Sequence, residues 1–351
     1  MEFFARNWKF IAALAGIAIT REMLQRRKMI DLRGKVVLIT GSSRGLGLAL
    51  AKEFAAEGAK LILCARDEDE LNRARMGLAE QGADVLTLVC DVTDQTAAQR
   101  TIEQAIGHYG RLDVLVNNAG VISAGAWRTQ THADFEDAFN IMFWGPFHMT
   151  MAALPFMTER KSGRIVNITS VGGKVSVPHL LSYSSAKFAA VGFSEGLHAE
   201  LAQEGIVVVT VAPGLMRTGS QVNTVIKGSD HQTEYTLFTL LDTLPVSSIS
   251  VKRAARQIVR ATRRGTTELI ITLPAQLLAR FHGALPGLST EILGLVNRLL
   301  PTSDATGTER HAGRESETPL TRSFLTSLGR RAARDYNEQP GPSIQTESSQ
   351  H

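Results

Sequence analysis

The sequence has few of the features that mark metal-binding, disulfide-bonded or nucleic-acid-binding proteins. Only two of its 351 residues are cysteines, and the histidines are scattered without HxxxH spacing or cysteine pairing. We therefore expect neither a metal site nor a disulfide. The formal net charge of +4 is small for this length, and basic residues are not interleaved with aromatic ones. This composition argues against binding to nucleic acid.

The two cysteines, Cys64 and Cys90, each end an apolar run of the length expected for a strand. We interpret them as buried structural thiols. Low cysteine usage of this kind is compatible with a reducing compartment, and we predict that the catalytic domain lies in the cytoplasm.

The hydrophobic run near the N-terminus is too short for an ordinary membrane-spanning helix. Residues 10–20 carry no charge and lie between Lys9 and Arg21 in a leader that we bound at residues 1–30. As a helix the run would be about 16 Å long, against a hydrocarbon core of about 30 Å. Aromatic residues precede it and the basic cluster 26–28 follows it, which favours a monotopic or re-entrant anchor. A cleaved signal peptide or an extra helix packed on the domain or on a partner are the alternatives.

A glycine-rich turn follows the first apolar run of the main domain. Residues 35–40 read as a strand buried on both faces, and a helical stretch covers residues 48–57. Between them Gly41, Gly45 and Gly47 are spaced as Gly-x3-Gly-x-Gly. Glycines at a strand-to-helix turn allow a diphosphate to approach the backbone, and the helix N-terminus favours its negative charge.

A tyrosine and a lysine are spaced for acid–base chemistry. Tyr183 and Lys187 lie at i and i+4, which places them on one face of a helix. An ammonium beside a phenol favours the phenolate, so we expect Lys187 to lower the pKa of Tyr183. Ser170 ends an apolar strand thirteen residues before the tyrosine, where its hydroxyl could bond the oxygen whose proton Tyr183 handles.

Further motifs complete a recognisable set. One apolar strand ends in the sequence Asn-Asn-Ala-Gly at residues 117–120, another ends at Pro213 and Gly214, and Asn140 lies in a helical segment. With the glycine turn and the Tyr-x3-Lys pair, these motifs resemble the short-chain dehydrogenase/reductase family in order and spacing. The resemblance covers about residues 31–273 and lacks no motif.

The resemblance implies roles for particular residues. Tyr183 would be the general acid or base, Ser170 would orient the substrate oxygen, Lys187 would also bind the cofactor ribose, and Asn140 would hold a proton-relaying water. The remaining residues implied for the cofactor, besides Tyr183 and Lys187, are Gly41, Ser43, Arg44, Gly45, Leu46, Gly47, Arg66, Asp91, Val92, Asn118, Ala119, Gly120, Pro213, Gly214 and Thr218.

The fold expected from hydrophobic periodicity agrees with the resemblance. Short apolar runs begin near residues 35, 60, 84, 113, 163, 206 and 268, and most are separated by stretches long enough for one helix. This alternation predicts an α/β fold, a Rossmann-type doubly wound parallel sheet with helices on both faces. Ligands bind at the carboxyl ends of such strands, where the motif loops converge.

The second apolar strand ends in Arg66, and Arg44 lies within the glycine turn. Arginines there resemble those of NADP-preferring members of the family, because a guanidinium matches a 2′-phosphate. We therefore predict NADP as cofactor, with NAD as the alternative because Asp67 follows Arg66 directly. Asp91 would meet the adenine.

The chain after residue 273 is predicted to form two further parts. Residues 274–301 read as two apolar helices that could cover the substrate cleft, form an oligomer contact or lie on a bilayer. Residues 302–351 are rich in Ser, Thr, Glu, Arg and Gly and are expected to be mostly disordered, with a short basic helix within residues 320–334. A basic helix is also expected over residues 251–264, with its apolar side chains facing inward.

The expected activity is NAD(P)-dependent interconversion of a carbonyl and a secondary alcohol, most simply reduction by NADPH. Residues 215–248 stand where the family places its substrate lid, and they are rich in leucine and aromatic residues, as are residues 142–144. This favours an apolar substrate resembling a lipid, steroid or retinoid, reached from a membrane surface. Two alternatives are an epimerase or dehydratase of the same fold and a non-catalytic cofactor-sensing scaffold. A homo-oligomer is possible.

Overall fold

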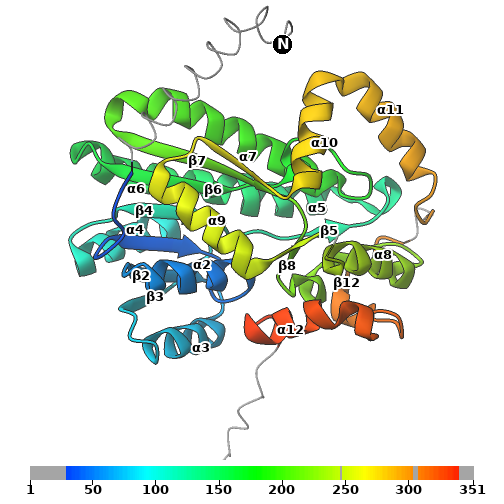
Figure 1. Cartoon of the computed structure of the whole chain (residues 1–351), viewed down its shortest axis with the longest axis horizontal. Coiled ribbons are helices and arrows are strands. Elements are labelled where there is room, and N and C mark those ends of the chain that lie inside the picture. The colour runs from blue at the N-terminus through cyan, green and yellow to red at the C-terminus, as the bar shows by residue number, and fades with distance from the viewer. Residues whose placement is uncertain (1–28, 246, 303–306, 340–351) are drawn as a thin grey trace, which may run out of the picture.

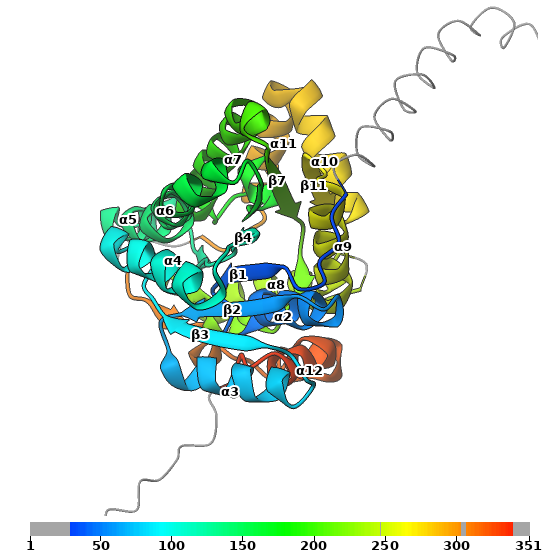
Figure 2. The ribbon, with the colours of Figure 1, turned by 90° about the vertical axis from the view of Figure 1, so that its left-hand side faces the viewer.

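A parallel sheet of seven strands forms the centre of the structure (Figures 1 and 2). The computed structural model describes residues 29–245, 247–302 and 307–339. The sheet order is β11-β7-β6-β4-β1-β2-β3. Its strands are β1 (Val36–Thr40), β2 (Lys60–Ala65), β3 (Val85–Val89), β4 (Val114–Asn117), β6 (Gly163–Ile168), β7 (Ile206–Pro213) and β11 (Glu268–Ile271). Each begins within one residue of the position expected from periodicity, so the predicted Rossmann-type sheet is confirmed.

Two layers of helices cover the sheet. One face carries α2 (Gly45–Ala56), α3 (Glu68–Ala79) and α9 (Val251–Arg264), and the other carries α4 (Gln95–Tyr109), α6 (Gly145–Glu159) and α7 (Leu181–Glu200). Alternate residues of β1 serve the two cores: Val37 and Ile39 pack toward α2, whereas Val36 and Leu38 pack toward α4 and α6. All four are at most 1 % exposed, which explains the unbroken apolar run in the sequence.

Helix α9 buries the face that was expected. Ala254, Ala255, Ile258 and Val259 are at most 2 % exposed, and its last turn holds Arg263 at the surface side. The helix starts at the Ser250 cap, whose hydroxyl accepts a bond from the amide of Arg253, and ends at Gly265 in the left-handed region.

Smaller elements build the edge of the sheet where the strands end. They are β5 (Ser123–Ala124), α5 (His132–Phe139), the π-helix Asn140–Trp144, β8 (Met216–Arg217), β9 (Val225–Ile226), α8 (His231–Thr243) and β10 (Ile249–Ser250), with 3-10 turns at Trp127–Thr129, Val171–Gly173 and Ser220–Asn223. A further 3-10 turn, Leu201–Glu204, precedes β7 at the opposite edge. The segment expected to be the lid therefore contains a full helix, α8, and a 3-10 turn.

The C-terminal region departs from the expected disorder over residues 307–339. These residues form β12 (His311–Ala312), two 3-10 turns (Gly313–Glu315 and Phe324–Thr326) and α12 (Ser327–Asp335). β12 pairs with β9, and α12 lies close to α2, α3 and α8 in both views (Figures 1 and 2). This region contains few large apolar side chains and is instead held by close contacts of its backbone with the lid. At Gly313, for example, a Cβ would lie only 2.0 Å from the carbonyl oxygen of Gln221. The expected short basic helix is present as α12.

Two helices after the last sheet strand form a hairpin that projects from the layers (Figure 1). They are α10 (Leu273–Ala284) and α11 (Pro286–Asn297), and the single residue Leu285 joins them. Within the described residues, no helix combines the length and the apolar character needed to cross a bilayer. The predicted leader anchor, residues 1–30, lies outside the described residues except for Met29 and Ile30.

Candidate active site

The glycine turn between β1 and α2 has the close approaches that only glycine permits. Gly41 has φ +61°, and a Cβ on it would lie 2.9 Å from the Cα of Ala119. A Cβ on Gly47 would lie 2.1 Å from the carbonyl oxygen of Gly41. The turn and the first turn of α2 are thus packed backbone against backbone. Arg44 is the N-cap position of α2, and it makes no side-chain capping bond, so the first amides of the helix point toward the edge of the sheet.

The Asn-Asn-Ala-Gly loop after β4 holds this turn in place. The Thr40 hydroxyl accepts bonds from the amides of Asn118 and Ala119 at 2.9 and 3.0 Å. The Asn118 side chain donates to the carbonyls of Thr40 and Gly41 at 2.9 and 3.1 Å. Two loops that are far apart in the sequence are therefore one rigid unit, as the motif pattern predicted.

Asn117 has a different role from its neighbours in that motif. It is 2 % exposed, and its amide nitrogen donates to Thr150 and Asn167 at 3.1 and 2.9 Å. Asn167 in turn donates to Ser194. These buried hydrogen bonds link β4 and β6 to α6 and α7, and they fix the position of the loop that follows β4.

The residues predicted to select the cofactor lie where β1 and β2 end. Glu70 on α3 accepts bonds from the Ser43 hydroxyl at 2.8 Å and from the Arg44 guanidinium at 2.9 Å. Arg66 is exposed, and its guanidinium lies 3.9 Å from the Asp91 carboxylate. The two arginines thus pair with different carboxylates, and Glu70, the partner of Arg44, is a residue that the motif pattern had not indicated.

The remaining predicted cofactor residues line the same edge of the sheet. Asp91 accepts two bonds from Thr93, which orders the loop after β3. Val92 is buried against the position of Gly145, and Leu46 is buried in the first turn of α2. Gly120 lies near Lys187, since a Cβ on it would be 3.9 Å from the lysine nitrogen.

On the lid side of the crevice, Pro213 ends β7 opposite Ile271, and the Gly214 amide bonds the Ile271 carbonyl at 3.0 Å. Thr218 is buried, with its hydroxyl 2.7 Å from that of Ser220. The structure thus brings the predicted cofactor residues to one end of the sheet, and the lid begins there.

Ser170 and Tyr183 are adjacent. Ser170 stands just after β6 and caps the turn Val171–Gly173, accepting a bond from the Gly172 amide at 3.0 Å. A Cβ on Gly172 would lie 3.1 Å from the Tyr183 ring and 3.3 Å from the Ser170 hydroxyl. Glycine at position 172 leaves room for both side chains, and the Ser170 hydroxyl acts to lower the pKa of the phenol. The two residues that the sequence assigned to one substrate oxygen are therefore adjacent in the structure.

Lys187 lies one turn further along α7 and is 5 % exposed. Its ammonium donates to the carbonyl of Ile168 at 2.9 Å and lies 5.8 Å from the centroid of the Tyr183 ring. Burial lowers the pKa of Lys187 to about 8. A carbonyl partner without a carboxylate leaves the charge poorly compensated, which is why the shift is downward.

The pKa of Tyr183 moves opposite to the expectation. Desolvation raises it, and the Ser170 hydroxyl offsets only part of that rise. At 5.8 Å from the ring centre the lysine is too far from the phenol to reverse the effect of burial. The neutral phenol, a proton donor, is thus the favoured form in this structure.

Asn140 begins the π-helix that joins α5 to α6. Its own side chain is exposed, and its carbonyl accepts from the Gly145 amide. The wider π turn interrupts the helical ladder beside α7, a distortion that is frequent at functional sites. No sequence signal had indicated it, because the flanking residues read as continuous helix.

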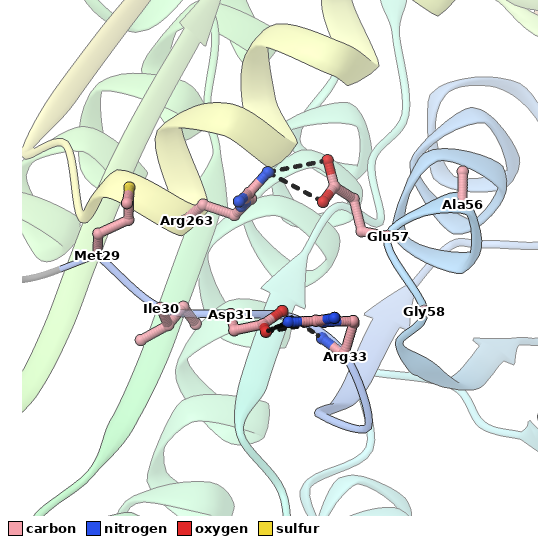
Figure 3. A pocket seen from close by; sticks show the side chains of 8 residues that line it. All are labelled: Met29, Ile30, Asp31, Arg33, Ala56, Glu57, Gly58 and Arg263. Atoms are coloured by element: carbon pink, nitrogen blue, oxygen red, sulfur yellow. Dashed lines mark hydrogen bonds and ion pairs between the residues drawn. The ribbon is translucent and has the colours of Figure 1, made fainter.

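A shallow cavity of about 550 Å³ lies elsewhere (Figure 3). It is lined by residues 29–31 and Arg33, which precede β1, by residues 56–58, which precede β2, and by Arg263, which precedes β11. It therefore lies at the amino ends of the strands, on the edge opposite the predicted site. Its charges are paired, since Arg263 binds Glu57 at 2.9 Å and Arg33 binds Asp31 at 2.6 Å. It carries none of the predicted chemistry.

The position of the glycine turn suits a dinucleotide. The turn joins β1 to the N-terminus of α2, where the N-cap residue Arg44 makes no side-chain capping bond, and a helix N-terminus of this kind favours the negative charge of a diphosphate. Within the described residues no cluster of histidine, cysteine or acidic side chains could hold a metal.

Comparison with known proteins agrees with this geometry. The profile of the short chain dehydrogenase family matches residues 35–227. A dehydrogenase/reductase SDR family protein 7-like from Anopheles gambiae is 40 % identical over 207 residues, covering 57 % of this chain and 65 % of that protein. A granaticin polyketide synthase putative ketoacyl reductase 1 from Streptomyces violaceoruber is 40 % identical over 185 residues, covering 52 % and 68 %. The matched part is thus about two thirds of each relative.

A solved structure shows the same likeness in three dimensions. The actinorhodin polyketide ketoreductase with NADPH superimposes with a TM-score of 0.61 at 30 % identity, over 68 % of this chain and 95 % of that one.

Proposed function

The chain belongs to the short-chain dehydrogenase/reductase family, and on that premise we propose that it is a nicotinamide-dependent oxidoreductase that interconverts a carbonyl group and a secondary alcohol. The observation that carries the proposal is the contact between Ser170 and Tyr183 beside the buried ammonium of Lys187. A phenol that donates, a hydroxyl that orients and a nearby cation suit proton transfer to a carbonyl oxygen.

The chain's own residues account for the proton half of the reaction. The nicotinamide, when bound, supplies hydride to the carbonyl carbon. Tyr183 donates its phenolic proton to the carbonyl oxygen, and Ser170 holds that oxygen by a hydrogen bond. The positive charge of Lys187 stabilises the phenolate that remains. In this proposal Asn140, at the start of the π turn, holds a water that returns the proton.

We propose NADPH as the physiological cofactor and reduction as the direction. Arg44 follows β1 and Arg66 directly follows the neighbouring strand β2, and a guanidinium suits a 2′-phosphate; the actinorhodin ketoreductase, a structural relative, is described with NADPH. Glu70 and Asp91 each pair with one of these arginines. When a 2′-phosphate binds, it would therefore replace these carboxylates as the partner of both guanidinium groups.

The substrate that we propose is an apolar carbonyl compound reached from a membrane surface. Large apolar side chains are exposed on elements bordering the carboxyl edge: Trp144 at the end of the π turn, Leu181 at the start of α7, Leu237 and Leu241 on α8, and Leu273 at the start of α10. Tyr235 and Met142, by contrast, are buried and serve packing.

The hairpin of α10 and α11 extends this apolar surface. Its exposed members are Leu273, Leu277, Phe281, Leu285, Leu288, Ile292, Leu295, Val296 and Leu299. A patch of this kind marks a contact with lipid or with another protein. We propose lipid as the partner, with the leader as a second anchor, and a cytoplasmic catalytic domain.

Two experiments test these proposals. NADPH oxidation with a panel of apolar and polar ketones separates a reductase from an epimerase or dehydratase, which regenerates its cofactor, and from a scaffold, which turns over nothing.

Cosedimentation with anionic vesicles tests the proposed membrane contact: the full chain should bind, and a chain beginning at Asp31 should bind more weakly. Substitution of Leu277 and Leu295 by serine should weaken it further. Equal recovery of all three in the supernatant, together with preference for small polar ketones, would refute the membrane proposal.

A further inference from the structure

The C-terminal segment lies directly on the glycine turn. The Gly45 amide, at the start of α2, donates to the carbonyl of Tyr336 at 2.8 Å. The Asn337 side chain donates to the Ser43 carbonyl at 3.2 Å, and Lys52 on α2 donates to the Asp335 carbonyl at 3.1 Å. The first amide of α2 therefore donates to a backbone carbonyl of the segment that follows α12. The N-cap residue of α2, Arg44, makes no side-chain capping bond.

A buried carboxylate comes with it. Glu338 is 4 % exposed, and one of its carboxylate oxygens would lie 2.3 Å from a Cβ placed on Gly45. The other lies 3.6 Å from the Arg44 guanidinium and accepts from the Asn223 amide at 2.7 Å. The carboxylate is thus enclosed between the glycine turn and the lid, and nothing but glycine at position 45 would leave room for it.

The lid holds the segment in that place. A Cβ on Gly219 would lie 2.3 Å from the backbone of Ala333, and one on Gly329 would lie 2.8 Å from the side chain of Gln221. Asn223 also donates to the Glu338 backbone carbonyl at 3.0 Å. Helix α12 and the lid therefore pack as a unit that presents Glu338 to the N-terminus of α2.

An anion at that helix N-terminus is what the proposed function assigns to a cofactor phosphate. We propose that residues 335–338 form an autoinhibitory strap, in which Glu338 and the Tyr336 carbonyl occupy the place of the dinucleotide diphosphate, so that cofactor binding must displace the strap. This inference rests on the proposed function. Because strap and lid are one unit, displacement would also loosen the lid over the substrate crevice.

The charged form of the Glu338 carboxylate is disfavoured in this position. Burial raises the pKa of Glu338 to about 7, and the nearby Glu70 carboxylate adds to the rise, while Arg44 and Asn223 offset only part of it. A docked carboxylate at neutral pH therefore keeps a desolvation cost that a diphosphate, with more negative charge and more acceptor oxygens, is better able to offset.

The test compares dinucleotide affinity in three chains. Dissociation constants for NADPH and for NADH are measured by calorimetry with the full chain, with Glu338→Ala, which removes the side chain held by Asn223 and Arg44, and with a chain ending at Asp335. We expect both variants to bind about fivefold more tightly, the factor for a strap that closes the site in about four fifths of molecules. Glu309→Ala, which removes a carboxylate that is 83 % exposed, is the matched control and should match the full chain.

A second measurement keeps the test independent of variant folding. Hydrogen exchange of the unmodified chain, with and without NADPH, should show faster exchange at residues 336–338 when the dinucleotide is bound. Slower exchange there, or affinity in both variants equal to or below that of the full chain, would show that the segment clamps the cofactor or is merely structural, and would overturn the inference. Failure of the full chain and both variants to bind any dinucleotide would overturn the proposed function as well.

Discussion

The ammonium of Lys187 lies 5.8 Å from the centroid of the Tyr183 ring, one turn further along α7. Burial lowers the pKa of the lysine to about 8, and desolvation raises that of the tyrosine. At neutral pH the phenol therefore keeps its proton while the lysine is mostly charged. This is the combination that a reduction requires, because the phenol donates and the cation stabilises the phenolate left behind.

The pH profile of reduction should follow the lysine. We expect kcat/KM for ketone reduction to fall as the pH rises through about 8, because Lys187 loses its charge there while Tyr183 stays protonated. Lys187→Arg should have lower activity that does not fall further as the pH rises through about 8, because a guanidinium does not deprotonate in this range. A profile for the unmodified enzyme that stays flat to about pH 10, the ordinary pKa of both groups, would contradict the assignment.

Cofactor choice should depend on the two arginines. Arg44→Ala and Arg66→Ala are each expected to lower kcat/KM for NADPH by about tenfold and to change that for NADH little, since each removes a charge-assisted bond to the 2′-phosphate. Arg75→Ala, an exposed arginine on α3, is the control. An unmodified enzyme that prefers NADH, or equal losses with both cofactors, would refute the NADPH proposal.

The buried ion pair between Lys227 and Asp134 should be important for stability. The two groups are 2.5 Å apart, and both side chains are 1 % exposed. Asp134→Asn leaves the ammonium buried without its counter-charge, so we expect the free energy of unfolding to fall by about 3–5 kcal/mol. The exposed pair Arg331–Asp335 offers the control, and its Asp335→Asn variant should change stability by less than about 1 kcal/mol. Urea denaturation measures the free energy of unfolding of the Asp134→Asn and Asp335→Asn variants. Similar losses of stability in the two variants would contradict this prediction.

The sheet was predictable from the sequence because its strands are buried on both faces. Seven apolar runs with helical stretches between them allow few topologies, and motif loops at the ends of such strands must meet at one edge. Ser170, Tyr183 and Lys187 were found for the same reason, since i and i+4 on a helix and a strand end fix their relative positions.

The C-terminal region and the Tyr183 pKa were not predictable in this way. Residues 307–339 contain few large apolar side chains, so composition indicated disorder; their order depends on glycines at close contacts, such as Gly219 and Gly313, which no periodicity reveals. Likewise, Tyr-x3-Lys spacing fixes a common helix face but gives neither the depth of burial nor the distance between the charged groups. Burial therefore determined the pKa direction.

Stability should fall as the pH rises from about 4 to 7. Asp242 on α8 is buried, and burial raises its pKa from 3.8 to about 7, opposed by the Met216 amide and Arg217 and reinforced by Glu338. A raised pKa in the folded state favours folding below the unfolded value, and that contribution is lost as the pH passes the folded value. Asp242→Asn should flatten this part of the profile in denaturation from pH 5 to 8. Parallel profiles for the two proteins would refute it.

The most direct test of the account is steady-state turnover by Tyr183→Phe. The variant keeps the ring and loses only the hydroxyl, so we expect kcat for NADPH-dependent reduction of an apolar ketone to fall by about 10²–10⁴-fold with the dissociation constant for NADPH near that of the unmodified chain. Tyr109→Phe, on α4 and bonded to Asp84, removes a hydroxyl away from the site and should leave kcat unchanged. Near-normal turnover by Tyr183→Phe would contradict the account.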